Sequence, residues 1–539
     1  MGFTRSARLT GGLGAALLCS LGLAVAARAD SPQFTVGVLP QATGVTYGAA
    51  AGGRNEDVEP GIGVGGDGVI WVGSNLDVNT SADPRTAVAI AGEDIWKSTD
   101  GGQTFQWVAA PFNETSSTAG LGGEDSDLTV APVKNANGFY NVYATSLYVA
   151  ASNMAYSQDG GATWTDITLG GIPAQDRPWI AADGACTFYL TYHQLPLFSP
   201  IVNKYDVCNL TNIGAGFTLN PVQSTALFTQ NTIPGLTNAF GKTIVDNSST
   251  SPFQHNVYVP MEACNLTTPT DYFNNVVGTA EQVPTCPTGV NTEVEIGVST
   301  DGGQTYNDYV VAYNGNGETQ VWPTSLGVDA TGELYMVWSD NHHGYLSTST
   351  DGGKTWSAKQ QIDASLVGTV TYPTVAAADK GIVDVAYYAT SAAGDANDLT
   401  VMGTPGSPTS AQWHLYWQAS SNGGTSFSAP QAVTTTNHTG VLCTMGSACS
   451  ISGSRNLYDD FGVVISPVTG NPTIAFDADQ PFNAPLGNAA VDPYTAYATE
   501  VSQPSSSTPE APVSAALVMG GLVSVLGAAA LRRRRSQQR

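Results

Sequence analysis

The chain has 539 residues, of which 42% are hydrophobic and 12% are charged, with 44 acidic residues against 19 basic ones. Three basic residues lie in the first 29 positions and five in the last eight, so the part between them carries 11 basic residues against all 44 acidic ones, a formal charge of −33. Binding to phosphate depends on clustered Lys and Arg, so this charge excludes nucleic acid and favours an uncharged or cationic ligand, or bound metal cations.

The N-terminal segment has the pattern of a secretory signal. Two arginines precede an apolar run over residues 13–27, and Ala27-Arg28-Ala29 has the small-x-small form that signal peptidase cleaves. We predict that residues 1–29 form a signal peptide and that the mature chain begins at Asp30. The alternative is an uncleaved N-terminal helix, for which the apolar run is short.

The C-terminal segment has the pattern of a membrane anchor. Residues 513–531 carry no charge, and four consecutive arginines follow, which predicts a transmembrane helix with residues 532–539 as a basic cytoplasmic tail. Residues 503–512, QPSSSTPEAP, form a Pro/Ser-rich linker that would hold an ectodomain of residues 30–502 outside the cell. The tail resembles the sorting signals of Gram-positive surface proteins. TPEAP replaces their Leu-Pro-x-Thr-Gly motif, so we expect an anchor without covalent attachment to the wall.

Six cysteines remain after removal of the signal, an even number that indicates disulfides in an exported chain. Six cysteines allow fifteen connectivities. Pairing each cysteine with its neighbour in the sequence predicts three bonds: Cys186–Cys208, Cys264–Cys286 and Cys443–Cys449. The alternatives are free buried thiols or a metal site, although no paired C-x-x-C is present.

One eight-residue pattern occurs five times. The copies are STDGGQTF at 98–105, SQDGGATW at 157–164, STDGGQTY at 299–306, STDGGKTW at 349–356 and, degraded, SSNGGTSF at 420–427. Each copy predicts a tight hairpin, in which the Asp or Asn accepts backbone N–H groups, the glycine pair adopts positive φ and the aromatic residue packs on the sheet. Repetition of this kind indicates a repeat architecture.

These copies match the Asp-box, S-x-D-x-G-x-T-W, so the chain resembles sialidases and other Asp-box propellers. The resemblance implies an all-β β-propeller of four-stranded blades, with each box between the outer strands of a blade. In that family the boxes are structural and lie away from the ligand. We therefore interpret all five copies as markers of the fold.

A second repeat gives the number of blades. Hairpins of two alternating apolar strands recur at a mean step of about 67 residues, which fits one blade with its loops. They lie at 59–74, 127–145, 177–194, 241–260, 322–340, 372–390 and 458–479. Seven hairpins favour seven blades over the six of sialidases, although the third and seventh lack a box. The alternating segment Gln33–Val38 is expected to close the ring by completing the last blade.

Polar clusters precede several of the inner strands, where the loops of a propeller converge on its axis. They are Arg54–Asp57, Glu124–Asp127, Asp176-Arg177 and Arg455–Asp460. The part of the chain expected outside the cell has four arginines, and three of them fall in these clusters. We therefore predict one shared axial site. The alternatives are solvated loop carboxylates and structural ion pairs of Arg177 and Arg455 with Asp176 and Asp459.

The resemblance to sialidases implies roles for some of these residues. Sialidases hold the sugar carboxylate with three arginines and use a tyrosine nucleophile helped by a glutamate, with an aspartate as acid. The corresponding candidates here are Arg54, Arg177 and Arg455 for the carboxylate, Tyr458 as nucleophile, Glu124 or Glu262 as its helper, and Asp57 as acid. The Phe/Tyr-Arg-Ile-Pro motif of sialidases is absent, because Arg54 is followed by Asn-Glu-Asp.

The same acids also suit a hard cation. Asp125, Asp127, Asp459 and Asp460 offer oxygen ligands with which we expect Ca²⁺ to bind along the axis, although no cofactor is required by any motif. The six histidines are scattered and form no zinc-binding pattern.

The sequence predicts a monomeric surface protein that recognises a carbohydrate or a cell-surface polymer. If the protein is an enzyme, the resemblance implies a glycosidase of the exo-α-sialidase type. The alternative is a noncatalytic adhesion or scaffold protein that binds other proteins through the propeller.

Overall fold

The computed structural model describes a chain that is almost entirely β-structure. The described residues are 32–43, 54–76, 93–112, 125–148, 151–171, 175–194, 199–208, 218–227, 235–265, 293–313, 324–363, 368–444, 449–481 and 493–501. They include one short helix, α2 (Leu399–Met402), and 31 strands. The segment Phe34–Ser502 forms one compact unit.

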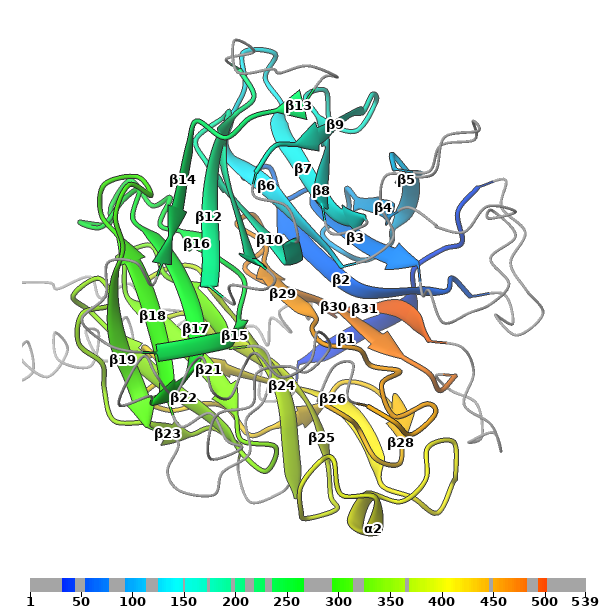
Figure 1. Ribbon diagram of the computed structural model, residues 1–539. Coiled ribbons are helices and arrows are strands. Elements are labelled where there is room, and N and C mark those ends of the chain that lie inside the picture. The colour runs from blue at the N-terminus through cyan, green and yellow to red at the C-terminus, as the bar shows by residue number, and fades with distance from the viewer. Residues whose placement is uncertain are drawn as a thin grey trace, which may run out of the picture. The chain divides into compact units, whose positions relative to one another are not determined.

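The strands form seven antiparallel blades, numbered here in chain order (Figure 1). Blade 1 consists of β2 (Asp57–Val64), β3 (Ile70–Leu76), β4 (Glu93–Ser98) and β5 (Gln106–Ala109). Blade 2 consists of β6 (Ser126–Lys134), β7 (Tyr140–Tyr148), β8 (Ala151–Ser157) and β9 (Thr165–Leu169), joined by β13 (Thr218–Leu219). Blade 3 consists of β10 (Gln175–Asp183), β11 (Thr187–Gln194), β12 (Ser199–Asp206) and β14 (Gln223–Ala226).

Blades 4 to 6 repeat this order, and blade 4 has its inner strand in two pieces. Blade 4 consists of β15 (Gly235–Phe240) with β16 (Ile244–Val245), β17 (Val257–Asn265), β18 (Glu293–Ser299) and β19 (Asn307–Tyr313). Blade 5 consists of β20 (Ser325–Val328), β21 (Leu334–Ser339), β22 (Gly344–Ser349) and β23 (Gln360–Gln361). Blade 6 consists of β24 (Thr369–Ala377), β25 (Val383–Thr390), β26 (Gln412–Ser420) and β27 (Gln431–Ala432), with β28 (His438–Thr439) beside β26.

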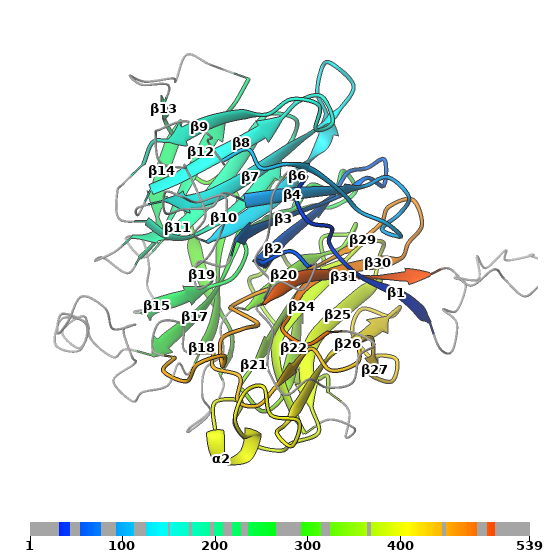
Figure 2. The same cartoon turned by 90° about the vertical axis from the view of Figure 1, so that its right-hand side faces the viewer.

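Blade 7 joins the two ends of the propeller. It pairs β29 (Gly462–Ile465), β30 (Pro472–Ala478) and β31 (Tyr494–Val501) with β1 (Gln33–Val38), as Figure 2 shows. The predicted closure by Gln33–Val38 is therefore confirmed, as is the prediction of seven blades. Blades 3 and 7 are complete four-stranded sheets even though neither has an Asp-box.

Each Asp-box lies between the third and fourth strands of its blade, and the first one shows how a box packs. Gly102 has φ 86° and lies against blade 7 so closely that an added Cβ would come within 2.6 Å of the hydroxyls of Thr473 and Thr499. Thr499 donates a hydrogen bond to the Gly102 carbonyl at 2.7 Å. The box therefore closes its own hairpin and also fastens the blade to its neighbour.

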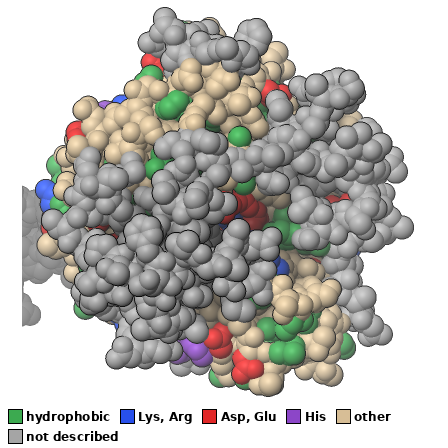
Figure 3. All heavy atoms as spheres, viewed as in Figure 1, with side chains coloured by type: hydrophobic (Ala, Val, Ile, Leu, Met, Phe, Trp, Pro, Cys, Tyr) green, Lys and Arg blue, Asp and Glu red, His purple; other side chains and the backbone are tan. Residues whose placement is uncertain are grey.

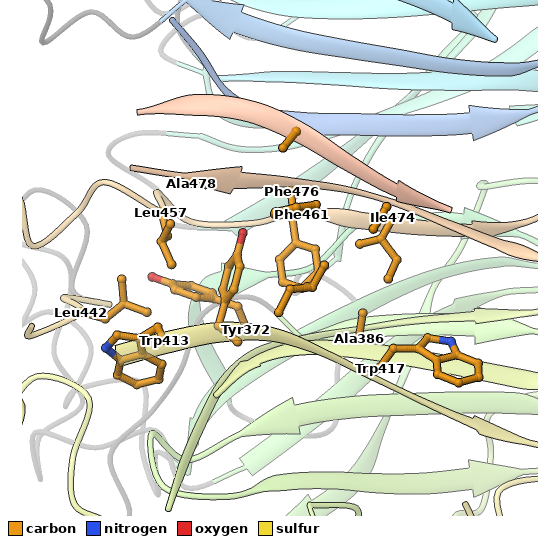
Figure 4. Packing of buried hydrophobic residues seen from close by; sticks show 14 of the residues in the cluster. Tyr372, Ala386, Trp413, Trp417, Leu442, Leu457, Phe461, Ile474, Phe476 and Ala478 are labelled. Atoms are coloured by element: carbon orange, nitrogen blue, oxygen red, sulfur yellow. The ribbon is translucent and has the colours of Figure 1, made fainter. Parts of the chain in front are cut away.

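The hydrophobic core is divided among the contacts between neighbouring blades. Each of seven buried clusters joins side chains of two adjacent blades, because the alternating strands of a blade present apolar side chains on both faces. Figure 4 shows the cluster between blades 6 and 7, which includes Trp413, Trp417 and Phe476. It also includes Tyr372, at the start of the inner strand β24.

Two of the predicted disulfides are present, Cys186–Cys208 in blade 3 and Cys443–Cys449 in the segment between blades 6 and 7. Their presence fits an extracellular protein. The third prediction involves Cys286, which lies outside the described residues, as do the signal, linker, anchor and tail segments. Within the described residues, no helix has both the length and the apolar character of a membrane span.

Candidate functional site

Four residues with strained backbone mark the inner strands on the side of the predicted axial site. Glu59, Arg177, Tyr372 and Tyr458 have φ of 55°, 54°, 49° and 48°, in the left-handed region that costs a non-glycine residue about 1–3 kcal/mol. The first three each precede a proline and fall where the strand register shifts. Such bulges redirect a side chain and are found near active sites.

Arg177 lies at the centre of the charges that these strands bring together. Its guanidinium contacts Asp459 at 2.5 Å, Asp460 at 3.0 Å and Glu59 at 3.4 Å, and Arg177 is only 5% exposed. Arg455 pairs with the same Asp459 and lies 4.0 Å from Glu59, with a third of its side chain exposed. These five residues are called the axial ion cluster.

The electrostatics of the cluster follow from its burial. Burial alone would lower the pKa of Arg177, but Glu59, Asp125 and the other carboxylates raise it well above its ordinary value, so the guanidinium stays charged. Burial raises the pKa of Glu59 to about 7 against the opposing charge of Arg177. Glu59 also accepts a hydrogen bond from Asn75 at 3.1 Å, so its position is fixed on both sides.

A carboxyl pair adjoins the cluster. Asp125, just before β6, and Asp176, in β10, share a side-chain hydrogen bond, and the backbone N–H of Arg177 donates to Asp125 at 3.2 Å. Burial and the negative charge of Asp125 raise the pKa of Asp176 to about 7. Although burial opposes it, Arg177 lowers the pKa of Asp125. Asp176 is therefore the carboxyl of the pair that retains a proton as the pH rises toward 7, whereas Asp125 ionises at lower pH.

Asp125 and Asp176 are half-buried, whereas Glu59, Arg177 and Asp459 are buried. The pair and the axial ion cluster together are called the axial mouth. Figure 3 shows acidic side chains near the middle of the viewed face. Both guanidinium groups of the axial mouth are paired with carboxylates of the protein itself, so an anionic ligand would have to displace those carboxylates.

A cavity of about 220 Å³ adjoins the axial mouth and is lined by residues of all seven blades. Asp460, in the cluster, is part of its wall. A second ion pair also lines it, because Lys242 contacts Asp127 at 2.6 Å and donates to the carbonyl of Leu128 at 2.8 Å. Asp127 is fully buried, and 31% of the Lys242 side chain is exposed.

The structure brings some of the predicted substrate-binding residues together and places others apart. Arg177 and Arg455 converge, but on carboxylates of the protein itself, as in the structural ion-pair alternative. The guanidinium of Arg54 lies 5.0 Å from the ring centre of Tyr494, at the start of β31. Arg54 has no ion pair with the acids of the cluster among the described residues.

The predicted catalytic residues lie in different parts of the propeller. Tyr458 is buried, with the Arg455 guanidinium 5.3 Å from its ring centre. Asp57 is fully buried at the start of β2, and Glu262 is buried in β17, the second strand of blade 4. Glu124 lies outside the described residues.

Protein cations are paired with three of the four acids predicted to bind calcium. Lys242 contacts Asp127, and Arg177 contacts Asp459 and Asp460. Asp125 is hydrogen-bonded to Asp176. In the described part of the chain, no three His, Cys, Asp or Glu side chains are grouped to hold a metal ion. Calcium binding stays a prediction from the sequence.

The candidates from the sequence did not include Glu59, Tyr372 and Lys242, and they named Asp176 only as a member of a polar cluster and as an ion-pair partner. A signal for two of them exists in the inner strands, where Glu59-Pro60 and Tyr372-Pro373 occupy the same position as Arg177-Pro178. In each of these three strands, the residue that precedes the proline lies at the bulge, so the recurring proline marks where the bulge occurs. Lys242 carries no such signal, because its partner Asp127 is 115 residues away.

No model of a known protein family matches the chain, and no curated protein matches its sequence. Solved structures with a similar fold include an α-L-arabinofuranosidase from Fusarium graminearum, at 12% identity and a TM-score of 0.39 over 67% of this chain and 94% of that one. A Hadza microbial sialidase is 15% identical, with a TM-score of 0.35 over 61% of this chain and 63% of that one. The lectin of Aleuria aurantia is 11% identical, with a TM-score of 0.36 over 69% of this chain and 93% of that one. Structural similarity this weak shows no activity for this chain, so its function has to be inferred from the residues at the axis.

Proposed function

We propose that this protein binds an uncharged or cationic carbohydrate at the axial mouth and hydrolyses a glycosidic bond there, with Asp176 as general acid. The observation that carries the proposal is the half-buried, hydrogen-bonded Asp125–Asp176 pair. Burial and the charge of Asp125 raise the pKa of Asp176 to about 7, whereas Arg177, although burial opposes it, lowers the pKa of Asp125. Paired carboxyls whose pKa values are pushed apart mark acid and base roles. A carboxylic acid that keeps its proton near neutral pH is what the leaving oxygen of a glycoside requires.

The chemistry follows from the two protonation states. Asp176 gives its proton to the leaving oxygen as the bond to the anomeric carbon breaks. The carboxylate of Asp125 stabilises the positive charge that develops on the sugar. Water then adds to the anomeric carbon and returns a proton to Asp176. Arg177 acts as a positioning residue, because its backbone N–H and its charge keep Asp125 ionised.

The charge of the axial mouth bears on the substrate class. A clamp for a sugar carboxylate needs arginines whose charge is not already neutralised. Arg177 contacts three carboxylates and Arg455 contacts Asp459, so an anionic sugar would have to compete with the protein's own acids. This competition favours an uncharged or cationic sugar over a sialic acid.

Turnover on a panel of aryl glycosides tests the proposal. We expect the purified protein to hydrolyse at least one neutral aryl pentoside or hexoside and to leave an aryl sialoside intact. Asp176→Asn should lower kcat by at least about a hundredfold, the usual contribution of a general acid, while the fold is retained. Activity should fall as the pH rises above about 7, because Asp176 then loses its proton.

The matched control is Asp67→Asn, in the exposed turn between β2 and β3, which should leave kcat unchanged. Wild-type protein without turnover on any glycoside would overturn catalysis and leave a noncatalytic binding protein. Full activity of Asp176→Asn would remove Asp176 from the mechanism.

A further inference from the structure

The cavity beside the axial mouth contains buried polar groups without hydrogen-bond partners. The hydroxyls of Tyr372 and Thr324 accept and donate no hydrogen bond among the described residues, although these residues are only 2% and 1% exposed. Both residues line the cavity. A buried hydroxyl left unpaired costs about 1–3 kcal/mol, so these two hydroxyls are available to form hydrogen bonds with a ligand in the cavity.

The rest of the wall is mainly apolar, and its charges are already paired. Trp179, Ile244 and Phe461 supply flat and aliphatic surface. Lys242 is paired with Asp127, and burial raises the pKa of Asp460 well above its ordinary value against the opposing charge of Arg177. The cavity therefore offers no net charge to a ligand. It offers hydroxyl groups, which both donate and accept, beside aromatic rings.

We propose that this cavity is a binding subsite for one uncharged monosaccharide unit, held by the hydroxyls of Tyr372 and Thr324 and by the faces of the surrounding apolar side chains. At about 220 Å³ the cavity is below the range of ordinary ligand pockets and fits a single ring better than an oligosaccharide. Apolar walls with a few placed polar groups are the usual composition of such sites. The choice of a sugar as ligand rests on the proposed function.

The position of Tyr372 also connects the subsite to the axial mouth. Its φ of 49° is strained, and the strain sets its ring at the start of β24, where blades 6 and 7 meet (Figure 4). Burial raises its pKa well above the ordinary value, and Asp459 raises it further, which places the hydroxyl in the field of the cluster. The hydroxyl therefore stays protonated and is able to donate a hydrogen bond to a sugar oxygen.

Calorimetric titration of the purified full chain with D-glucose, D-galactose, L-arabinose and L-fucose tests the subsite. At least one should bind, and Tyr372→Phe and Thr324→Val should each weaken that binding about twofold to tenfold, the range for one hydrogen bond. Neither substitution should lower the melting temperature of the free protein, because each removes an unpaired buried hydroxyl. N-acetylneuraminic acid, which carries a negative charge, should bind more weakly than the neutral sugar.

Tyr306→Phe is the matched control, since the Tyr306 hydroxyl is equally buried and unpaired but belongs to the Asp-box of blade 4 and does not line the cavity. It should leave sugar binding unchanged. Absence of binding by any of the four sugars, or binding unaffected by both cavity variants, would overturn the subsite. Asp176→Asn separates the two proposals. If it binds the monosaccharide as wild type does but no form of the protein shows turnover, only the hydrolytic function fails.

Discussion

The Asp-box turns and the axial ion cluster both depend on carboxylates, but they are assembled in opposite ways. In the box of blade 5, the carboxylate of Asp351 accepts from the backbone N–H groups of Lys354 and Thr355 and from the hydroxyl of Ser349, all within four residues. In the cluster, the partners of Arg177 lie 118, 282 and 283 residues away in the sequence. The box is thus held together by residues close in sequence, whereas the axial ion cluster is assembled from residues that only the tertiary structure brings together.

The difference appears in the acids themselves. The box aspartates are exposed or half-buried. Burial is the largest single influence and would raise their pKa values, but hydrogen bonds from nearby Ser, Thr and backbone groups together lower them; they are Asp100, Asp159, Asp301 and Asp351. At the axis, burial raises the pKa values of Glu59 and Asp176 to about 7. A box acid is therefore stabilised as an anion, whereas Glu59 and Asp176 at the axis keep a proton to higher pH.

Removing the central cation should have the largest effect. Arg177→Met would leave Glu59, Asp459 and Asp460 buried together without their main counter-charge, which costs roughly 3–5 kcal/mol when a buried pair is broken. Urea unfolding at pH 7 would measure the loss. Lys97→Met is the control, because Lys97 donates to the Gly160 carbonyl near the surface and its loss should cost under about 1 kcal/mol. Equal effects of the two variants would contradict a buried, charge-dependent cluster.

Two aspartates of blade 4 should respond to pH in opposite directions. Burial raises the pKa of Asp308 to about 7, and its carboxylate has no hydrogen-bond partner among the described residues. Since its folded pKa lies above the ordinary value of 3.8, its stabilising contribution is complete below pH 3.8 and is lost as the pH rises through 7. Asp308→Asn should therefore stabilise the protein at pH 8, on the order of 2–4 kcal/mol, and do little at pH 4.

Asp301, in the box of the same blade, is the counterpart. Its hydrogen bonds lower its pKa, so its contribution is present above pH 3.8 and is lost as the pH falls through the lowered value. Asp301→Asn should slightly destabilise the protein at pH 8. Thermal unfolding of both variants across pH 4–8 checks the contrast, and a common sign at pH 8 would show that burial does not separate the two kinds of acid.

The smallest effect is expected within a box. Asp351→Ala removes the acceptor for two backbone N–H groups and should cost about 1–2 kcal/mol, as loss of a helix N-cap does. Asp351→Asn should cost less than half of that. In blade 6, Asn422 already fills the same position, where its side-chain oxygen accepts from the Ser426 N–H at 3.0 Å. Chemical denaturation of the two variants ranks them, and an Asn as costly as an Ala would mean that the charge, and not the geometry, closes the turn.

The sequence by itself determined the features that depend on neighbouring residues. The boxes, the hairpin repeat, the closing strand at Gln33–Val38 and the bonds Cys186–Cys208 and Cys443–Cys449 were all predictable, because their partners are close in sequence or follow from the repeat. The polar clusters before the inner strands predicted that Arg54, Arg177 and Arg455 would share one axial site, and Arg177 and Arg455 do meet there, on Asp459.

Only the tertiary structure decided what these residues do when they meet. The properties of a charge depend on which other charges burial brings within about 4 Å, and no local pattern encodes that distance. The fold set Arg177 among the protein's own carboxylates, placed Arg54 against Tyr494 and raised the pKa of Asp176 by burying it beside Asp125. The repeat in the sequence thus specified the ring, whereas the chemistry of the axis arose from seven strands meeting in space.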